Sequence, residues 1–185
     1  MDELIDIVTE HGESTGRSAL KSIIHQKGYY HNTAHIWFYT LDNKILLSQR
    51  AASKVICPLL WDVSIAGHID SGESIIEGAI RETKEEIGID INENDLKKIG
   101  VFKCTQSYDN TIFDNEFHHT FISILKVPLS KLIPQEDEVA ALKLVSFDKF
   151  QALINHIGND NHFVPSNKDY YQSVLQNIIH ASKSS

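Results

Sequence analysis

A helix with one apolar side and one acidic side is the clearest element that the hydrophobic pattern predicts. Between residues 75 and 87 the apolar positions recur at spacings of three and four, and a helix advances by about 100° per residue. They are Ile75, Ile76, Ala79, Ile80, Thr83 and Ile87. Ser74 and Glu77 form a capping box, and Gly88 suits the left-handed residue that ends a helix. On the other side, Gly78 is predicted to leave room for a ligand because it lacks a side chain.

The rest of the chain alternates between strand-like and helix-like patterns. Strands are predicted over residues 4–8, 60–65, 99–105, 117–127 and 142–147, and a hairpin joins 34–41 to 44–49 at Asp42-Asn43. Helices are predicted over about 17–25, 148–154 and 168–181. The sequence shows no repeats or low-complexity linkers. We therefore expect a single domain over residues 1–185, with an N-terminal extension covering about residues 1–30.

Three carboxylates gather on the polar side of the 75–87 helix. Glu82, Glu85 and Glu86 fall within an arc of roughly 100°. Glu82 and Glu86 repel each other at a spacing of four, and on that face only Arg81 and Lys84, at its margins, could neutralise them. An ordinary solvated acidic face is the alternative, but a divalent cation is the natural counter-charge. Carboxylate oxygens favour Mg²⁺ or Mn²⁺ over Zn²⁺, which prefers nitrogen and sulfur ligands.

The sequence around this helix resembles the Nudix box, G-x5-E-x7-R-E-U-x-E-E-x-G-U with U aliphatic. Residues 67–89 read GHIDSGESIIEGAIRETKEEIGI and match all seven fixed positions, and Thr83 at the first aliphatic position is a departure. The resemblance implies an α/β (α+β) Nudix fold, in which helices sandwich a mixed β-sheet. It also implies a pyrophosphohydrolase, an enzyme that cleaves a diphosphate linked to another group.

The resemblance to the Nudix box also implies roles for individual residues. Glu82 and Glu86 would bind the metal, with Glu85 beside them, and the backbone carbonyl near Ala66 often adds a ligand in that family. Glu73 and Arg81 would brace the loop against the helix through a carboxylate–guanidinium contact. A cation that bridges diphosphate oxygens reduces their negative charge and so favours attack by water on phosphorus. The expected cofactor is therefore Mg²⁺ or Mn²⁺.

A second resemblance covers most of residues 1–150. Residues 28–73 and the run Asp114-Asn115-Glu116 are similar to the branch of the superfamily that includes isopentenyl-diphosphate isomerases. That branch has a catalytic cysteine directly before the Gly-His pair, where this chain has Ala66. We therefore expect a hydrolase on an isomerase-like frame. An isomerase-type enzyme and a non-catalytic nucleotide-binding regulator are the alternatives.

Several polar residues match metal-binding positions of the isomerases and could form a second metal site. His25 lies one residue from another such position. The interpretation favoured on sequence is that His31 and His35 hydrogen-bond to the backbone at a strand start and that His68 caps the loop, because histidine is commonly a satisfied polar residue. The matching positions are His31, His68, Asp114 and Glu116.

The catalytic base is expected outside the box. Glu116 is the first candidate, because the apolar strand predicted after it should carry it into the sheet near the box helix. Glu136 and Glu138 lie in a late acidic run that is ordinarily solvated, and Glu138 is the second candidate. Arg50 and Lys54 are expected to hold the substrate phosphate, with an exposed basic pair as the alternative.

Composition narrows the partners. The chain has 185 residues and a net charge of −8 with only three arginines, which disfavours a nucleic-acid duplex. The resemblance to the Nudix box implies a small-molecule diphosphate as the partner. No apolar run approaches the ~20 residues of a membrane helix, so no membrane is expected. Cys57 and Cys104 lack metal spacing, and the acidic start indicates a cytoplasmic protein. The resemblance leaves a homodimer open and does not identify the leaving group.

Overall fold

A seven-stranded mixed sheet forms the centre of the computed structural model, which describes residues 2–109, 111–158 and 163–183. Its strands are β3 (His31–Tyr39), β4 (Lys44–Arg50), β5 (Trp61–Asp62), β6 (Ile65–His68), β7 (Lys97–Tyr108), β8 (Ile112–Ile124) and β9 (Val139–Ser146). The order is β5-β4-β3-β8-β7, with β6 paired to β3 and β9 paired to β4. β3 and β8 are parallel, and the other pairs are antiparallel.

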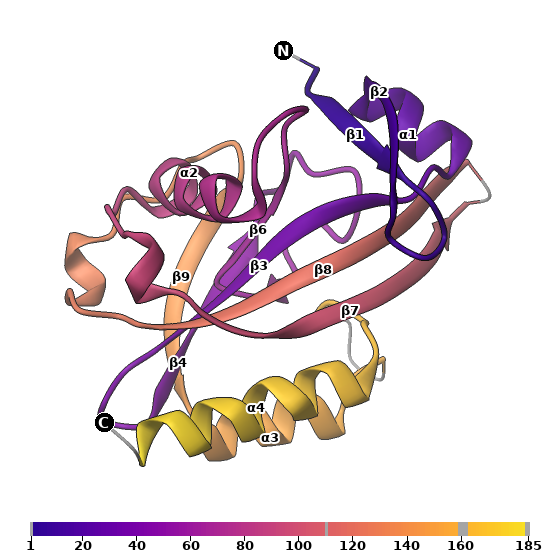
Figure 1. The fold of residues 1–185 in the computed structure, drawn as a ribbon. Helices are drawn as coiled ribbons and strands as arrows, with labels where there is room; N and C mark the ends of the chain where they lie inside the picture. The colour runs from indigo at the N-terminus through magenta and orange to yellow at the C-terminus, as the bar shows by residue number, and fades with distance from the viewer. Residues whose placement is uncertain (1, 110, 159–162, 184–185) are drawn as a thin grey trace.

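Helices cover both faces of this sheet (Figure 1). α2 (Ile75–Ile87) lies on one face, and α3 (Phe147–Asn155) and α4 (Lys168–Ser182) lie on the other. Side chains alternate along a strand, so Ile36 and Phe38 of β3 pack in the core with α2. Trp37 and Tyr39 pack in the core with α3 and α4. The expected fold, a mixed sheet between helices, is confirmed.

The N-terminal segment forms a hairpin and a short helix beside the sheet. β1 (Leu4–Val8) pairs with β2 (Ser14–Leu20), and α1 (Lys21–Lys27) ends at Gly28 with φ 64°. The helix expected over 17–25 is therefore wrong at its start, because Arg17 lies in β2 opposite Ile7. Pairing with β1 overrides the local helix preference of this segment. As a result α1 begins later and places His25 next to β8, where it faces Asp114.

Three of the predicted strands, at 60–65, 99–105 and 117–127, differ clearly from the structure. β7 extends beyond both ends of the segment expected at 99–105. β8 begins before the segment expected at 117–127 and ends before residue 127, so Asp114 and Glu116 lie inside β8 on one face. The strand expected over 60–65 is divided into β5 and β6 around Ser64. The Ser64 hydroxyl donates to the Leu46 carbonyl at 2.6 Å and accepts from the Phe38 amide at 2.9 Å. These bonds satisfy polar groups at a buried break between strands.

α2 has the predicted bounds, but one of its residues has a different role. The capping box of Ser74 and Glu77 is present, and Gly88 ends the helix with φ 75°. A Cβ at Gly78 would lie 2.6 Å from Ile69 Cδ1 and 3.0 Å from Glu73 Oε2. Protein atoms therefore fill the space beside Gly78, and the expectation that a ligand occupies it is wrong.

Gly78→Ala should lower the free energy of unfolding by about 1–3 kcal/mol. Alanine favours a helix over glycine by about 1 kcal/mol, but the added methyl group overlaps Ile69. Urea unfolding would measure the change. Ile69→Val deletes the Cδ1 atom, so the penalty of Gly78→Ala should be smaller in an Ile69→Val background. An equal or larger penalty in that background would contradict this packing account.

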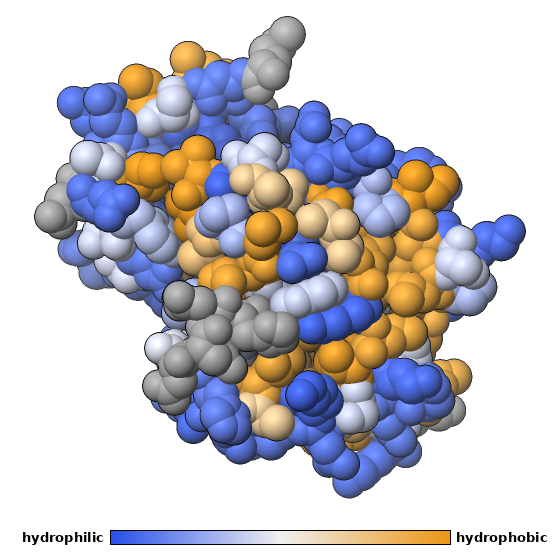
Figure 2. Space-filling view, turned by 180° about the vertical axis from the view of Figure 1, so that it is seen from behind, coloured by the Kyte–Doolittle hydropathy of each residue, from blue (hydrophilic) through white to orange (hydrophobic). Residues whose placement is uncertain are grey.

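Polar side chains surround a more hydrophobic centre on one face of the molecule (Figure 2). Viewed from behind, hydrophilic residues make up most of the rim and hydrophobic ones gather towards the middle of the face (Figure 2). Within the described ranges, no helix is both long and apolar enough to cross a bilayer. The two cysteines, Cys57 and Cys104, are free thiols.

Candidate active site

Arg81 joins the box loop to the box helix. Its Nε and Nη2 atoms donate to the two oxygens of Glu73, each at 2.9 Å, and Nη2 also donates to the His68 carbonyl at 2.9 Å. Nη1 donates to Glu82 at 2.8 Å and to Glu85 at 3.1 Å. The expected contact between Glu73 and Arg81 is therefore present. Arg81 fixes the loop before α2 and the first of the helix carboxylates at the same time.

Glu82 and Glu86 reach the strand β6 from α2. Glu82 lies against Gly67 so closely that a Cβ there would be 2.0 Å from its Cδ. Glu86 is buried at 6% exposure, and its Oε1 accepts from the Ala66 amide at 3.3 Å. Glu85 differs, because its side chain is 51% exposed and turns to Arg81. The helix thus presents two enclosed carboxylates to the Ala66-Gly67 backbone and one open carboxylate, Glu85, to Arg81.

Nearby positive charge does not offset the burial of Glu82 and Glu86, so the pKa of each carboxyl group is raised. Burial raises the pKa of Glu82 to about 7, although Arg81 opposes the shift. Burial also raises the pKa of Glu86 well above its usual range, and the negative charges of Glu82 and Glu138 add to the effect. Lys84 does not relieve them, because it pairs with Asp90 at 2.8 Å. Two carboxyl groups that resist ionisation in this way fit a site for a divalent cation, which would stabilise both charges.

A cavity of about 770 Å³ is lined by Glu82 and Glu85 and by the Ala66-Gly67 segment, whereas Glu86 is not among its lining residues in the described part of the chain. Arg50 and Lys54 both line it, and their side chains are only 24% and 23% exposed, so they are not a freely exposed pair. Arg50 Nη1 lies 3.4 Å from Asp62 Oδ2, and Lys54 pairs with the carboxylate of Glu138. Glu138 lines the cavity as well. The structure therefore brings both predicted basic residues and one late-loop carboxylate to the cavity.

Glu136, the other late-loop carboxylate, is exposed. It does not line this cavity among the residues that the structure describes.

Glu116 also lines this cavity and is surrounded by the rings of His31, His68 and His118. Its Oε1 is 3.4 Å from His31 Nε2 and 3.8 Å from His68 Nε2. His118 Nε2 donates to its Oε2 at 2.7 Å. Burial alone would raise the pKa of Glu116, but the hydrogen bond from His118 and the nearby ring of His31 hold it well below the usual range. Glu116 is therefore a carboxylate that stays ionised, surrounded by imidazoles.

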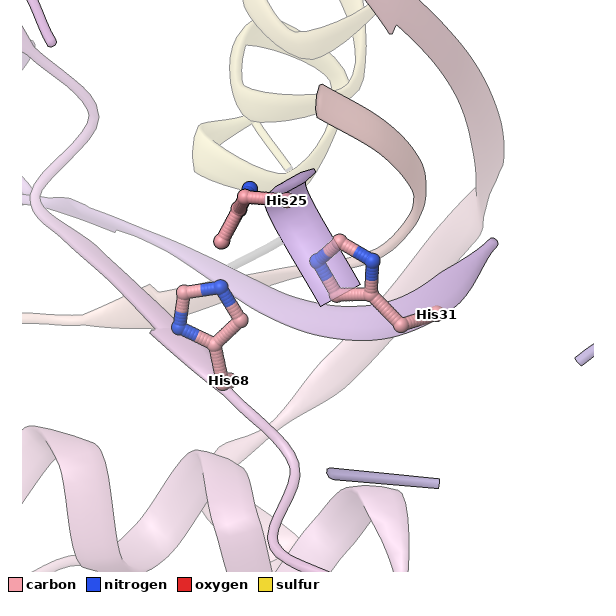
Figure 3. A group of neighbouring side chains, drawn as sticks. All are labelled: His25, His31 and His68. Carbon is pink, nitrogen blue, oxygen red and sulfur yellow. The ribbon is translucent and has the colours of Figure 1, made fainter. Parts of the chain in front are cut away.

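Three histidines from separate elements converge next to Glu116 (Figure 3). His25 comes from α1, His31 from β3 and His68 from β6, and their ring centroids are 5.3–5.5 Å apart. His25 Nδ1 lies 3.5 Å from Asp114 Oδ1. The possible ligand atoms form two groups that share His31, and within each group they lie within 4.8 Å of one another. One group is His25, His31 and His68, and the other is His31, Asp114 and Glu116.

Several atoms of this group are buried without a hydrogen bond. His25 Nδ1, His31 Nε2, His68 Nε2 and Asp114 Oδ1 have no such partner among the described residues. Burial lowers the pKa of His25 and holds that of His68 well below the ordinary value, so these rings are neutral at neutral pH and have lone pairs to offer. Clustered neutral imidazoles and carboxylates are a donor set that suits a divalent transition-metal ion.

The expectation that His31 and His35 hydrogen-bond to the backbone and that His68 caps the loop is correct only for His31. His31 Nδ1 does bond to the Tyr29 carbonyl at 3.1 Å. His35, in contrast, bonds through Nδ1 to the Tyr170 hydroxyl at 2.8 Å and not to the backbone. His68 lies near two carboxylates, Glu3 at 3.5 Å and Glu116 at 3.8 Å, rather than capping the loop.

Sequence reasoning missed residues that share this cavity. Tyr170, His118 and Asp62 line it, and none of them had an expected role. A signal existed for His118, because residues two apart in a strand share a face and Glu116 precedes it by two. Tyr170 comes from α4, and its position depends on packing that no local pattern shows.

Solved structures place this architecture in a known fold. The crystal structure of a Deinococcus radiodurans protein matches with a TM-score of 0.67 at 18% identity, over 95% of this chain and 98% of that one. The MutT protein of Methanosarcina mazei matches with a TM-score of 0.60 at 18% identity, over 80% and 94%. At these identities the likeness concerns the fold alone.

Sequence comparison then gives the family. The NUDIX domain model matches residues 29–166. The chain is 33% identical over 204 residues to an uncharacterized Nudix hydrolase of Clostridium acetobutylicum, covering 96% of this chain and 98% of that protein. It is 36% identical over 157 residues to an isopentenyl-diphosphate Delta-isomerase of Photorhabdus laumondii, covering 84% of each. The chain belongs to the Nudix hydrolase family, with isomerase-like relatives, as the box and the isomerase-like segments had indicated.

Proposed function

We propose that this enzyme hydrolyses the diphosphate linkage of a nucleoside diphosphate derivative or a related small diphosphate, with Mg²⁺ or Mn²⁺ as cofactor. The observation that carries the proposal is the pair of enclosed carboxylates, Glu82 and Glu86, which converge at the Ala66-Gly67 backbone. Glu82 and that backbone segment line a large cavity. Glu82 and Glu86 would hold the ion, with Glu85 at its open side. The bound ion would supply charge neutralisation on the diphosphate oxygens.

Arg50 and Lys54 would bind and orient the substrate phosphates. Each already faces a carboxylate in the cavity, Asp62 for Arg50 and Glu138 for Lys54. A diphosphate carries more negative charge than either carboxylate, so it can compete for both cations. Arg50 also donates to the Ile56 carbonyl at 2.9 Å, which restricts its guanidinium to the side of the cavity. This arrangement would orient one end of the substrate while the metal binds the other.

Glu116 is the proposed base for the attacking water when Mg²⁺ or Mn²⁺ occupies the helix carboxylates and no ion occupies the histidines. Glu116→Gln should reduce turnover by roughly 10²- to 10⁴-fold, because general-base catalysis contributes about that much. Substrate binding and the unfolding midpoint should persist, since glutamine keeps the shape of the side chain. Steady-state kinetics on Glu116→Gln and Glu138→Gln would separate the two candidates. Near-normal turnover of Glu116→Gln together with a collapse in Glu138→Gln would move the role to Glu138.

The histidine group is proposed as a second metal site, contrary to the interpretation favoured on sequence. Its support is the set of buried atoms without hydrogen bonds, which a cation would satisfy. His31→Ala should lower the metal content of the purified protein by about one ion per chain. His156→Ala, which removes an exposed histidine of the α3 terminus, is the matched control. Unchanged metal content in His31→Ala would exclude this site.

A prenyl-diphosphate isomerase is the second candidate, favoured by the isomerase relatives. Its weakness lies at Ala66, which offers no thiol at the position where the isomerases carry a cysteine. One assay distinguishes the candidates. Phosphate and pyrophosphate release should be followed on nucleoside diphosphates, nucleotide sugars, dinucleotides and prenyl diphosphates with Mg²⁺ or Mn²⁺, alongside prenyl isomerisation. Release of phosphate products supports the hydrolase, and isomerisation without release supports the second candidate.

A further inference from the structure

A second group of possible ligand atoms, from His35, His118 and Glu116, lies beside the group of His25, His31 and His68. His35 of β3 and His118 of β8 stack with ring centroids 3.9 Å apart and an interplanar angle of 21°. Both rings are enclosed, at 9% and 5% exposure. One ligand atom from each of His35, His118 and Glu116 lies within 4.8 Å of the others. The three residues also line the cavity, so an ion among them would be accessible to small molecules.

Glu116 faces the two groups with different oxygens. Oε1 is directed to His31 and His68, at 3.4 and 3.8 Å, whereas Oε2 is directed to His118, at 2.7 Å. A carboxylate with one oxygen on each side has the geometry of a bridge between two ions. Such bridged pairs are common in metallohydrolases, where two ions act on one substrate.

The hydrogen bonds around His35 leave one ring nitrogen for a ligand. His35 Nδ1 bonds to the Tyr170 hydroxyl at 2.8 Å, and that oxygen also accepts from Trp37 Nε1 at 2.9 Å. Metal-binding histidines characteristically donate through one nitrogen to a fixed partner and bind the ion through the other. Tyr170 and Trp37 are both buried, so the orientation of His35 is set by the core.

We propose that His35, His118 and Oε2 of Glu116 bind a divalent transition-metal ion, with Glu116 bridging to the His25, His31 and His68 group. Two imidazoles and one carboxylate suit ions such as Zn²⁺, Mn²⁺ or Fe²⁺ better than Mg²⁺. Ligand atoms at about 2.1 Å from an ion lie about 3 Å or more apart, so the contact between His118 and Glu116 needs to open by only a few tenths of an ångström. The remaining coordination positions would face the cavity.

Metal analysis of matched variants tests the site. The full chain, loaded with Zn²⁺ in excess Mg²⁺ and dialysed, should contain one more Zn²⁺ per chain than His118→Gln or His35→Gln. His119→Gln is the control, because His119 neighbours His118 on β8 but points away and bonds to Asn32 at 3.0 Å. It should keep the full content. Equal Zn²⁺ content in all four proteins would overturn the proposal.

Anomalous scattering from crystals of the unmodified protein soaked in Zn²⁺ gives a test that needs no variant. The proposal requires a peak bounded by His35, His118 and Glu116, separate from any peak beside His25. No peak there would overturn it even if the variants failed to fold. Neither measurement depends on hydrolysis. The metal site at His35 and His118 can therefore be disproved while the hydrolase activity is confirmed, and the hydrolase activity can be disproved while the metal site is confirmed.

Discussion

Glu86→Gln should reduce turnover by roughly 10²- to 10³-fold, or about 3–4 kcal/mol in the barrier. Glu86 is the more enclosed of the two proposed helix ligands, and glutamine offers the cation a neutral oxygen in place of a carboxylate. The fold should survive, because the glutamine oxygen can still accept from the Ala66 amide. The free energy of unfolding without metal should be equal or higher, since burial disfavours the charge that Glu86 carries.

Glu77→Gln is the matched control for Glu86→Gln. It lies on the same helix and makes the same chemical change, but its carboxylate caps the helix at Ser74, a role that glutamine also fills. Turnover of Glu77→Gln should stay close to that of the unmodified enzyme. If the two variants lost activity equally, the loss would reflect the helix rather than the metal ligand.

Gly67→Ala should abolish most activity with a much smaller effect on stability. The new Cβ would lie 2.0 Å from Cδ and 2.4 Å from Oε1 of Glu82. The strand backbone at Gly67 accepts alanine, because its φ is not in the left-handed region. The overlap falls on the end of a flexible side chain, so Glu82 would swing away and give up its 2.8 Å contact with Arg81. A metal ligand displaced in this way should cost roughly 10²-fold in turnover.

A double-variant cycle separates this explanation from general damage. If Gly67→Ala acts by displacing Glu82, adding it to Glu82→Ala should change turnover little further, because the group it displaces is already gone. Independent effects would instead multiply in the double variant. Full turnover of Gly67→Ala would mean that the observed position of Glu82 is not the catalytic one.

Local patterns predicted α2 well because its determinants are local. The apolar period, the capping box of Ser74 and Glu77, and Gly88 all lie within one short segment, and the structure has the predicted bounds. Gly78 shows the limit of such reasoning, because its environment depends on Ile69 and Glu73 across the loop. Helix propensity says nothing about what a missing side chain makes room for.

The histidine group could not be assembled from sequence patterns alone. Its members come from α1, β3, β6 and β8, and the strand register sets their proximity, with His31 opposite Glu116 and His68 opposite Thr33. The parallel pairing of β3 with β8 joins segments far apart in the chain. Resemblance to the isomerases named most of these residues. The spacing of two between Glu116 and His118 could have placed His118 beside them, whereas His35 needed the register of β3 against β8 to be known.

The most direct test of the central claim is to run the reaction in ¹⁸O-labelled water with a substrate found in the panel and analyse the products by ³¹P NMR. Water attack at phosphorus predicts one ¹⁸O atom in a phosphate-bearing product and loss of the original diphosphate bond. An intact diphosphate with no label on phosphorus, accompanied by a shifted carbon–carbon double bond, would contradict hydrolysis and favour an isomerase.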